Sequence, residues 1–365
     1  MKNISIYEPY LMGNEKKYVL DCLDTNWISS RGKYVQKFEK AFSNYVGNVE
    51  STTCSNGTVA LHLAVLALGI GAGDEVIVPS FTYIASVNAI KYVGAIPVFV
   101  DCNPDNWNMD IASVKKAISK NTKAIMCVHI YGVPCDIKAI CEIAKDNNIK
   151  VIEDCAEALG SKVNGTHVGT LSDISTFSFF GNKTITTGEG GMVVSKKSAL
   201  IERVAHLKSQ SVSPDITYWH DCLGYNYRLT NIASAIGLAQ LENIKEILLK
   251  KQNITNIYKS LLVPLDIKFQ MINKGDISSN WLNVILMPTI DIKEKVVNIL
   301  SEKNIEIRPA FPLVSKMPHY EYLNSINFPV GEKISQLAIC LPSHPGLKNR
   351  DVENICRLII HATNL

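Results

Sequence analysis

The sequence predicts an α/β protein with a mostly parallel sheet covered by helices on both faces, followed by a smaller α+β domain. Three observations lead to this prediction. Short apolar runs alternate with helical patterns between about residues 55 and 195, these runs are rich in β-branched residues, and the pattern changes after about residue 235. Continuous apolar runs indicate strands buried on both faces, which βαβ connections produce.

The elements of the first part follow one another in βαβ order. Strands are expected at 75–80, 96–101, 123–132, 150–155, 174–180 and 190–197. Helices are expected between several of them, at 58–68, 85–93, 111–119 and 137–146. This order favours right-handed crossovers within one mostly parallel sheet.

The second part of the chain has fewer strand patterns. One long helix is expected over 232–261, a strand in NWLNVILM, and further helices over 292–303 and 351–363. We therefore expect a large domain over 1–240 and a smaller α+β domain over 241–365. The first fifty residues, rich in Tyr and Ser, are expected to pack against the smaller domain or against a partner subunit.

Composition excludes several classes of protein. The 37 Lys and Arg residues nearly balance the 34 Asp and Glu residues, which argues against binding nucleic acid through a broad basic surface. The N-terminus MKNISIYEPYLMG has no signal-peptide h-region and no apolar run could cross a bilayer, so a cytoplasmic protein without a membrane partner is expected. The ten cysteines form no CxxC pair and lie mostly in apolar stretches, as Cys127 and Cys340 do. This pattern predicts reduced, buried thiols and no metal site.

A small polar cluster opens an apolar helix at Ser55-Asn56-Gly57-Thr58. Free backbone N–H groups and the helix dipole make such a helix start suitable for binding a phosphate. The same residues also fit a plain N-cap, which is the better interpretation of this segment taken alone.

Asp154 ends the apolar run KVIEDC. Its carboxylate is therefore expected at the carboxyl edge of the sheet, where open α/β sheets bind ligands. Burial of a carboxylate is costly unless it meets a positive partner, such as a protonated pyridine nitrogen. An Asp that merely caps a following helix fits the segment equally well.

Lys183 lies between the apolar run ISTFSFF and the Gly-rich turn TITTGEGG. A lysine in an enclosed site can lose its proton and attack a carbonyl carbon, whereas most lysines lie in surface loops. A phosphate site, a strand-end carboxylate and then a lysine are the parts that pyridoxal 5′-phosphate (PLP) requires. Each signal is weak alone, and their order makes PLP the favoured ligand.

Nearly the whole chain resembles the nucleotide-sugar aminotransferases of PLP fold type I, the DegT/StrS-like family. The likeness runs through NWISSRGKYVQKFE, SNGTVALHLA, VPSFTYIASVNAI, CVHIYGVPCD, EDCAEALGSK, FSFFGNKTITTGEGGMV, GYNYRLTNI and IGLAQLE. Within the family the chain is most similar to 4-aminotransferases that act on GDP-4-keto-6-deoxy-D-mannose. The resemblance implies PLP as cofactor, L-glutamate as amino donor, and a place in O-antigen or similar surface-polysaccharide synthesis.

The resemblance also implies roles for individual residues. Lys183 would carry the cofactor as a Schiff base, and Asp154 would pair with the pyridine nitrogen. Glu157 would lie near the ring hydroxyl, where many relatives have Gln, and Tyr83 would stack on the ring. The residues implied at the cofactor phosphate are Gly57, Thr58 and Ser178.

Three more positions concern the second subunit and the nucleotide. Asn226, in GYNYR, would reach the phosphate of the other subunit's cofactor, which implies a homodimer with shared active sites. Arg308, in IEIRPAF, resembles a residue that contacts the nucleotide phosphates, a role that suits the guanidinium fork. Relatives often have a His in the segment after it, where this chain has Ser315, so the contacts to nucleotide and sugar are left open.

Other functions stay open. One alternative is a dTDP- or UDP-linked 4-ketosugar as the substrate. Another is a 3-ketosugar, which YRLTNI argues against because 3-aminotransferases tend to have an acidic residue after the Arg-Leu pair. Ketosugar dehydratases of this fold replace the lysine with His, so Lys183 favours transamination. A non-catalytic sensor or regulator, or a plain binding protein for a phosphorylated ligand, is an alternative from another class, and the set of Lys183, Asp154 and Ser178 argues against the sensor.

Overall fold

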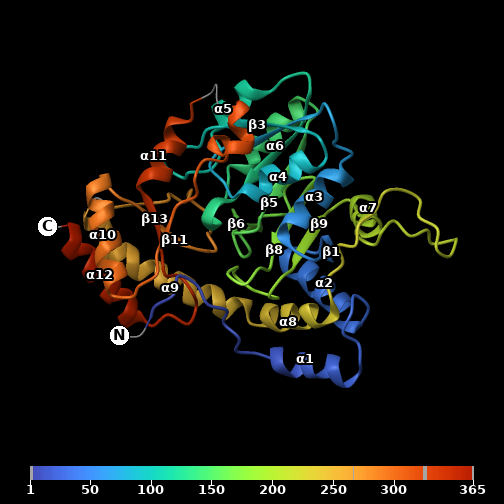
Figure 1. Cartoon of the computed structure of the whole chain (residues 1–365), viewed down its shortest axis with the longest axis horizontal. Coiled ribbons are helices and arrows are strands. Elements are labelled where there is room, and N and C mark those ends of the chain that lie inside the picture. The colour runs from blue at the N-terminus through green and yellow to red at the C-terminus, as the bar shows by residue number, and fades with distance from the viewer. Residues whose placement is uncertain (1–2, 266, 324–326, 364–365) are drawn as a thin grey trace.

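The computed structural model describes residues 3–265, 267–323 and 327–363. At its centre is a seven-stranded sheet with the strand order β1-β9-β8-β5-β4-β2-β3 (Figure 1). Strand β9 runs antiparallel to both of its neighbours, and the other described pairs of this sheet are parallel. The prediction of a mostly parallel sheet is confirmed.

The strands of the large sheet agree with the predicted runs to within a few residues. Their bounds are β1 Glu50–Cys54, β2 Glu75–Pro79, β3 Ile96–Val100, β4 Thr122–Val128, β5 Lys150–Asp154, β8 Ile174–Ser178 and β9 Gly191–Ser195. Strand β1 was not expected, because its sequence ESTTC lacks an apolar pattern. Strand β4 ends earlier than predicted, since Tyr131 adopts a left-handed conformation, with φ 53°, in the short 3-10 turn η1 Ile130–Gly132.

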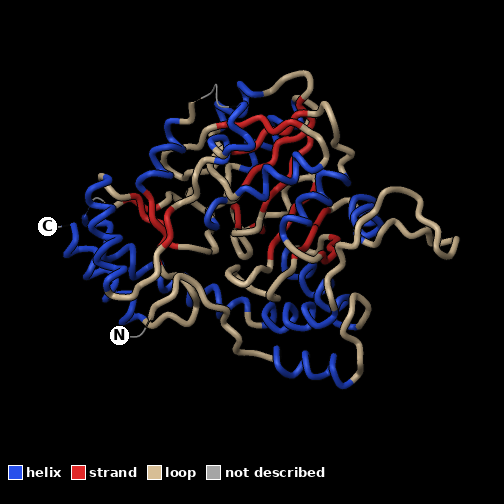
Figure 2. The backbone as a smooth tube through the Cα atoms, viewed as in Figure 1, coloured by secondary structure: helices blue, strands red, loops and turns tan. Residues whose placement is uncertain are grey.

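Helices cover both faces of the large sheet (Figure 2). One face packs against α3 Gly57–Ala67, α4 Ile84–Tyr92 and α7 Ser198–Lys208, and the other against α2 Lys33–Val46, α5 Ile111–Ala117, α6 Ile137–Asp146 and α8 Asn231–Glu242. Alternate residues of one strand enter the two cores: Val76 and Val78 pack with the first group, and Ile77 with the second. This period of two explains why buried strands read as continuous apolar runs.

A four-stranded antiparallel sheet forms the second part of the molecule. Its strand order is β10 Lys268–Phe269, β11 Asn283–Leu286, β13 Ala338–Leu341 and β12 Arg308–Pro309. The helices near it are α9 Ile244–Leu262, α10 Ile290–Glu302, α11 Pro329–Leu337 and α12 Asn349–Thr363. A separate apolar core joins this sheet to α9, α10 and α12. The observed α+β composition agrees with the expectation, while the division at 240/241 stays a prediction.

The expected single helix over 232–261 is wrong, because α8 and α9 are separate helices that meet at Asn243. The Asn243 side chain donates to the carbonyl oxygen of Ala239 at 3.0 Å, and its own backbone N–H bonds to the Gln240 oxygen in a tighter turn. A side chain that bonds back to the backbone competes with the helical pattern. The helical pattern is therefore interrupted at Asn243.

The N-terminal segment contacts both parts of the molecule. Helix α1 Glu15–Asp24 packs on α8, and Ile4 forms a β-bridge with Ile305, just before β12. The remaining short elements are β6 Lys162–Val163, β7 Thr166–His167, η2 Val263–Leu265, η3 Val314–Lys316 and η4 Pro318–Leu323. Within the described ranges, every helix is too short or too polar to cross a membrane.

All ten cysteines are free thiols. Most of them are buried, as the apolar flanks predicted, but Cys222 is exposed, so the expectation of burial is wrong at that position. Cys222 lies in a loop after α7 where several apolar side chains are also exposed.

Candidate active site

The predicted site residues meet at the carboxyl edge of the large sheet. Ile152 faces the core of α3 and α4, so Asp154, two residues further along β5, projects toward the same helices. In β8, Ile174 faces this core, and Thr176 and Ser178 follow at the same period. Side chains of two adjacent parallel strands therefore point toward the starts of α3 and α4, at the edge where such sheets bind ligands.

The start of α3 lies against the end of β8. Asn56 caps the helix, because its side-chain oxygen accepts the Val59 backbone N–H at 2.9 Å. A Cβ atom on Gly57 would lie only 2.7 Å from the Cβ of Ser178 and 2.9 Å from its Oγ, so this approach requires glycine. The cap and the phosphate site predicted from the sequence are therefore compatible, since the Ser178 hydroxyl lies beside the N-terminus of the helix that contains Thr58.

Asp154 is a buried carboxylate without a cation. It is 4% exposed, and no ion pair involves it in the described part of the chain. It accepts hydrogen bonds from the Ser86 hydroxyl at 2.8 Å and from the Ala156 N–H at 3.0 Å. Burial raises the pKa of Asp154. The alternative that it caps a following helix is wrong, because the next element after β5 is the strand β6.

Lys183 lies in the loop after β8, close to a second buried carboxyl group. Its side chain is 14% exposed, and Nζ is 3.9 Å from Oε1 of Glu157. Glu157 Oε2 accepts the backbone N–H of Tyr131 at 2.6 Å. Burial raises the pKa of Glu157 to about 7 and lowers that of Lys183, while the neighbouring carboxylates of Glu157 and Asp154 partly oppose the second shift. The two shifts bring the pKa values of the pair closer together than those of exposed groups.

Trp281 contacts the lysine and belongs to a group of stacked aromatic rings. Nζ of Lys183 is 3.9 Å from the ring centroid of Trp281, whose Nε1–H donates to the Asn182 carbonyl oxygen at 2.7 Å. Tyr131 stacks on Trp281 and on Phe311, at interplanar angles of 12° and 17°. Sequence reasoning assigned no role to these rings, and the left-handed Tyr131 left no sequence signal beyond HIYG.

The residues present fit PLP. Asp154 lacks an ion-pair partner among the described residues, and Tyr83, at the N-cap of α4, is 56% exposed. Buried oxygens of Thr176, Asn182 and Thr184 have no hydrogen-bond partner among the described residues. A phosphorylated pyridine would meet the open helix start, the lone carboxylate and the uncovered ring at the same time.

Three predicted positions lie outside this cluster. Asn226 is exposed and accepts a hydrogen bond from Arg228 at 3.0 Å. Arg308, at the edge strand β12, is half exposed and pairs with Glu306 at 3.1 Å. Ser315 is buried, and its hydroxyl lies 2.7 Å from that of Ser80, so this departure from the relatives packs inside the fold.

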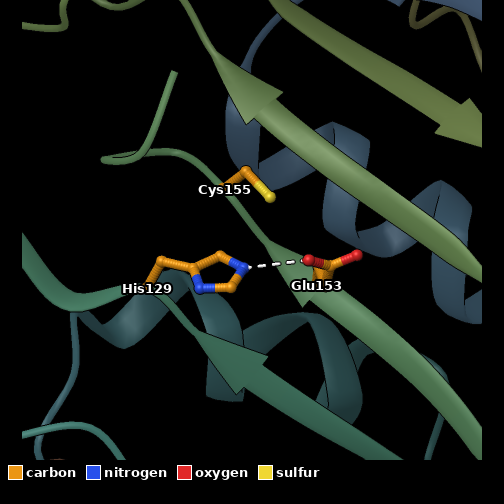
Figure 3. A group of neighbouring side chains, drawn as sticks. All are labelled: His129, Glu153 and Cys155. Carbon is orange, nitrogen blue, oxygen red and sulfur yellow. Dashed lines mark hydrogen bonds and ion pairs between the residues drawn. The ribbon is translucent and has the colours of Figure 1, made fainter. Parts of the chain in front are cut away.

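His129, Glu153 and Cys155 lie close together on the other side of the sheet edge (Figure 3). Nδ1 of His129 accepts the Cys135 backbone N–H at 3.0 Å, so Nε2 carries the ring proton and donates to Glu153 at 3.1 Å. The Glu153 oxygens also accept backbone N–H groups from Gly169, Leu171 and Ser172. Because the atoms of His129 and Glu153 that could bind a metal are already engaged in hydrogen bonds, this group is a hydrogen-bonded core cluster, not a metal centre.

A mostly parallel sheet that brings a buried carboxylate, a lysine and a helix start to one edge is the arrangement of a PLP-dependent enzyme of fold type I. The DegT/DnrJ/EryC1/StrS aminotransferase family matches residues 9–360, and the chain belongs to this family. A Streptococcus pneumoniae protein solved in PLP and PMP forms has TM-scores of 0.94 and 0.95 at 25% identity, and covers 100% of this chain and 99% and 98% of its own. The cofactor is therefore PLP.

The sequence relatives are more specific. The GDP-perosamine synthase of Escherichia coli O157:H7 is 52% identical over 359 residues, which cover 98% of both chains. The GDP-perosamine synthase of Vibrio cholerae is 47% identical with the same coverage. The likeness therefore extends through both sheets of the molecule.

Proposed function

We propose that this enzyme transfers the amino group of L-glutamate to carbon 4 of GDP-4-keto-6-deoxy-D-mannose and thereby forms GDP-perosamine. The observation that carries the proposal is the 52% identity to a GDP-perosamine synthase over 98% of both chains. The geometry supports the reaction class, since Lys183, Asp154 and the Gly57–Ser178 contact lie at one sheet edge.

Different residues of the site would bind the phosphate and the ring of the cofactor. The start of α3 at Gly57 and Thr58, together with the Ser178 hydroxyl, would bind the phosphate. Asp154, oriented by Ser86, would keep the ring nitrogen protonated, and Tyr83 would cover one ring face. When bound, PLP supplies an aldehyde that Lys183 can attack and a ring that withdraws electrons from the carbon bearing the transferred nitrogen.

Lys183 moves the protons. In the first half-reaction, Nζ would take the proton from Cα of glutamate and pass it to the cofactor, and in the second it would take a proton back from the cofactor and give it to carbon 4 of the sugar. Nζ must be neutral before it can accept a proton, and burial favours that state by lowering the pKa of Lys183. Glu157, 3.9 Å away, would contact the ring hydroxyl and limit how far that pKa falls.

We further propose a homodimer in which Asn226 completes the partner's phosphate site. Asn226 is exposed and follows a loop that presents unusually large apolar side chains to solvent, with Tyr218 93% and Leu223 80% exposed. Exposed apolar side chains gathered on one loop favour a protein contact. Arg308, exposed at an edge strand, would then bind the nucleotide phosphates in exchange for Glu306.

The proposed setting is the cytoplasm, where the product would supply O-antigen or similar polysaccharide synthesis. Ten free thiols without a disulfide support a reducing compartment.

The substrate is tested by comparing kcat/KM for the GDP-linked and dTDP-linked 4-keto-6-deoxyhexoses with glutamate as donor. A site that satisfies the edge of guanine leaves polar groups unpaired with thymine, so a preference on the order of 100-fold or more for the GDP sugar is expected. A preference for the dTDP sugar would overturn the nucleotide assignment. Product with nitrogen at carbon 3, identified by NMR, would overturn the regiochemistry.

The shared site is tested by mixing Lys183→Ala subunits with Asn226→Ala subunits. Each variant alone is expected to be nearly inactive, and the mixture should regain part of the activity because a hybrid dimer contains one intact site. Absence of rescue under proven subunit exchange would mean that each chain supplies its whole site.

A further inference from the structure

Lys251, on α9, is a fully buried lysine that the reaction does not use. It is 1% exposed, and no carboxylate pairs with it among the residues that the structure describes. Its Nζ instead donates to the backbone carbonyl oxygens of Trp281 at 3.0 Å and of Ser343 at 2.9 Å. A buried amino group without a counter-ion is costly, and here only two backbone carbonyl oxygens offset that cost. Its presence calls for a role beyond packing.

A second set of contacts links Lys251 to the reactive lysine. Nζ of Lys251 lies 4.9 Å from the ring centroid of Tyr7, in the N-terminal segment that runs beside α9 (Figure 1). The Tyr7 hydroxyl donates to the carbonyl oxygen of Lys183 at 2.7 Å. Trp281 Nε1 donates to the preceding carbonyl, that of Asn182, also at 2.7 Å. These five residues form a closed series of contacts, which we call the Lys251 circuit.

The Lys251 circuit contacts the loop after β8, whose backbone sets the position of Lys183. Side-chain oxygens of Asn182 and Thr184, on both sides of Lys183, have no partner within the described ranges. The loop is held instead by bonds to its backbone groups, including the bond from Lys183 N–H to the Phe180 oxygen at 2.9 Å. Two successive carbonyls of this loop are fixed by Tyr7 and Trp281, and both of these residues contact Lys251.

The circuit also reaches the amine itself. The Trp281 ring lies 3.9 Å from Nζ of Lys183, and an aromatic face stabilises an ammonium group. The carboxyl groups of Glu157 and Asp154 also face this amine. Asp154 ends β5, Glu157 lies in the loop after it, and Trp281 lies just before β11. A displacement of Trp281 would therefore change both the position and the charge state of Lys183.

We propose that Lys251 is a positioning residue for Lys183, acting through Trp281 and Tyr7 on the place and reactivity of the amine. The proposal rests on the proposed function only in that Lys183 is the reactive lysine. A lysine that merely joins α9 to the small sheet would affect stability and leave the reactivity of Lys183 unchanged.

The test uses the cofactor-free protein, so that it does not depend on turnover. Lys183 is alkylated with a small aldehyde and cyanoborohydride between pH 6 and 10, and its modified fraction is measured by peptide mass mapping. Lys251→Met should lower the midpoint of the pH profile and raise the rate at pH 8 by roughly fivefold, because the ring no longer stabilises the ammonium. Lys251→Arg should restore most of the wild-type profile.

Two further variants separate the contacts. Lys250→Met, next to Lys251 but on the exposed side of α9, is the matched control and should leave the profile unchanged. Tyr7→Phe keeps the ring over Lys251 and removes the bond to the Lys183 oxygen, so it should shift the profile in the same direction. Combined with Lys251→Met it should add little, as expected within one circuit.

An unchanged profile in Lys251→Met overturns the proposal, as do fully additive effects of Tyr7→Phe and Lys251→Met. If Lys251→Met does not fold, an unchanged profile in Tyr7→Phe overturns it instead. Failure of the proposed function is recognised separately, since Lys183→Ala would then still trap PLP covalently after borohydride treatment.

Discussion

The stability of the protein should depend on pH through Lys251, and replacement by Met should remove that dependence. Lys251 is 1% exposed, and burial lowers its pKa from 10.5 to about 7. Lys251→Met keeps an unbranched side chain of similar length and removes the titrating group. The carbonyl oxygens of Trp281 and Ser343 lose their donor in the variant.

The magnitude follows from linkage between protonation and folding. Because the pKa is lower in the folded chain, the unfolded chain binds more protons between pH 7 and 10.5. The contribution of Lys251 to the free energy of unfolding is complete above pH 10.5 and is lost as the pH falls toward 7. The slope reaches about 1.4 kcal/mol per pH unit, so the total change is at most about 5 kcal/mol.

The wild-type protein should therefore exceed Lys251→Met in stability at pH 10, where the neutral amine still donates to two carbonyls. This advantage should shrink steadily toward pH 7. Urea denaturation of the cofactor-free proteins at half-unit pH intervals measures the difference, and other titrating groups cancel between wild type and variant. Lys250→Met, which removes an exposed lysine paired with Glu246, should show no such slope. A difference between wild type and Lys251→Met that is constant across this range would refute the burial argument.

Three other substitutions test the site. Asp154→Asn should fold normally and lose several powers of ten in kcat, because an amide cannot keep the ring nitrogen protonated; near-normal rates with an unchanged melting temperature would contradict this role. Gly57→Ala should weaken PLP binding on the order of 10-fold or more in an absorbance titration, because the new Cβ would lie 2.7 Å from that of Ser178; unchanged affinity would show that the helix start does not hold the phosphate. Glu157→Gln should stabilise the cofactor-free protein above pH 7 and not near pH 4. The pKa of Glu157 is about 7 in the folded chain, above its unfolded value, so the stability that its protonation contributes is lost as the pH rises through 7. Equal urea midpoints of wild type and Glu157→Gln at pH 8 would exclude this.

Much of the fold and the centre of the site could be predicted from the sequence because the signals are local. Strands that are buried on both faces can be recognised from their own continuous apolar sequence, without knowing which strands pair with them. The apolar runs of β2, β3, β4, β5 and β8 are of this kind. Asp154 is the last residue of β5 and Lys183 lies in the loop after β8, so topology alone places them at the carboxyl edge. The glycine at the start of α3 was likewise evident, although its reason, the closeness of Ser178, was not.

The tertiary structure decided what depends on residues far apart in the chain. Strand β1 lacks an apolar pattern and is a strand because β9 pairs with it. Ser315 stands where relatives often have a His, and only the fold shows that its hydroxyl meets that of Ser80. No local pattern relates Lys251 to Tyr7 and Trp281, because their contact depends on how α9, the N-terminal segment and the small sheet pack around the active-site loop. The sequence by itself therefore determined the sheet and the chemistry at its edge, whereas the packing of distant segments determined how the reactive lysine is held.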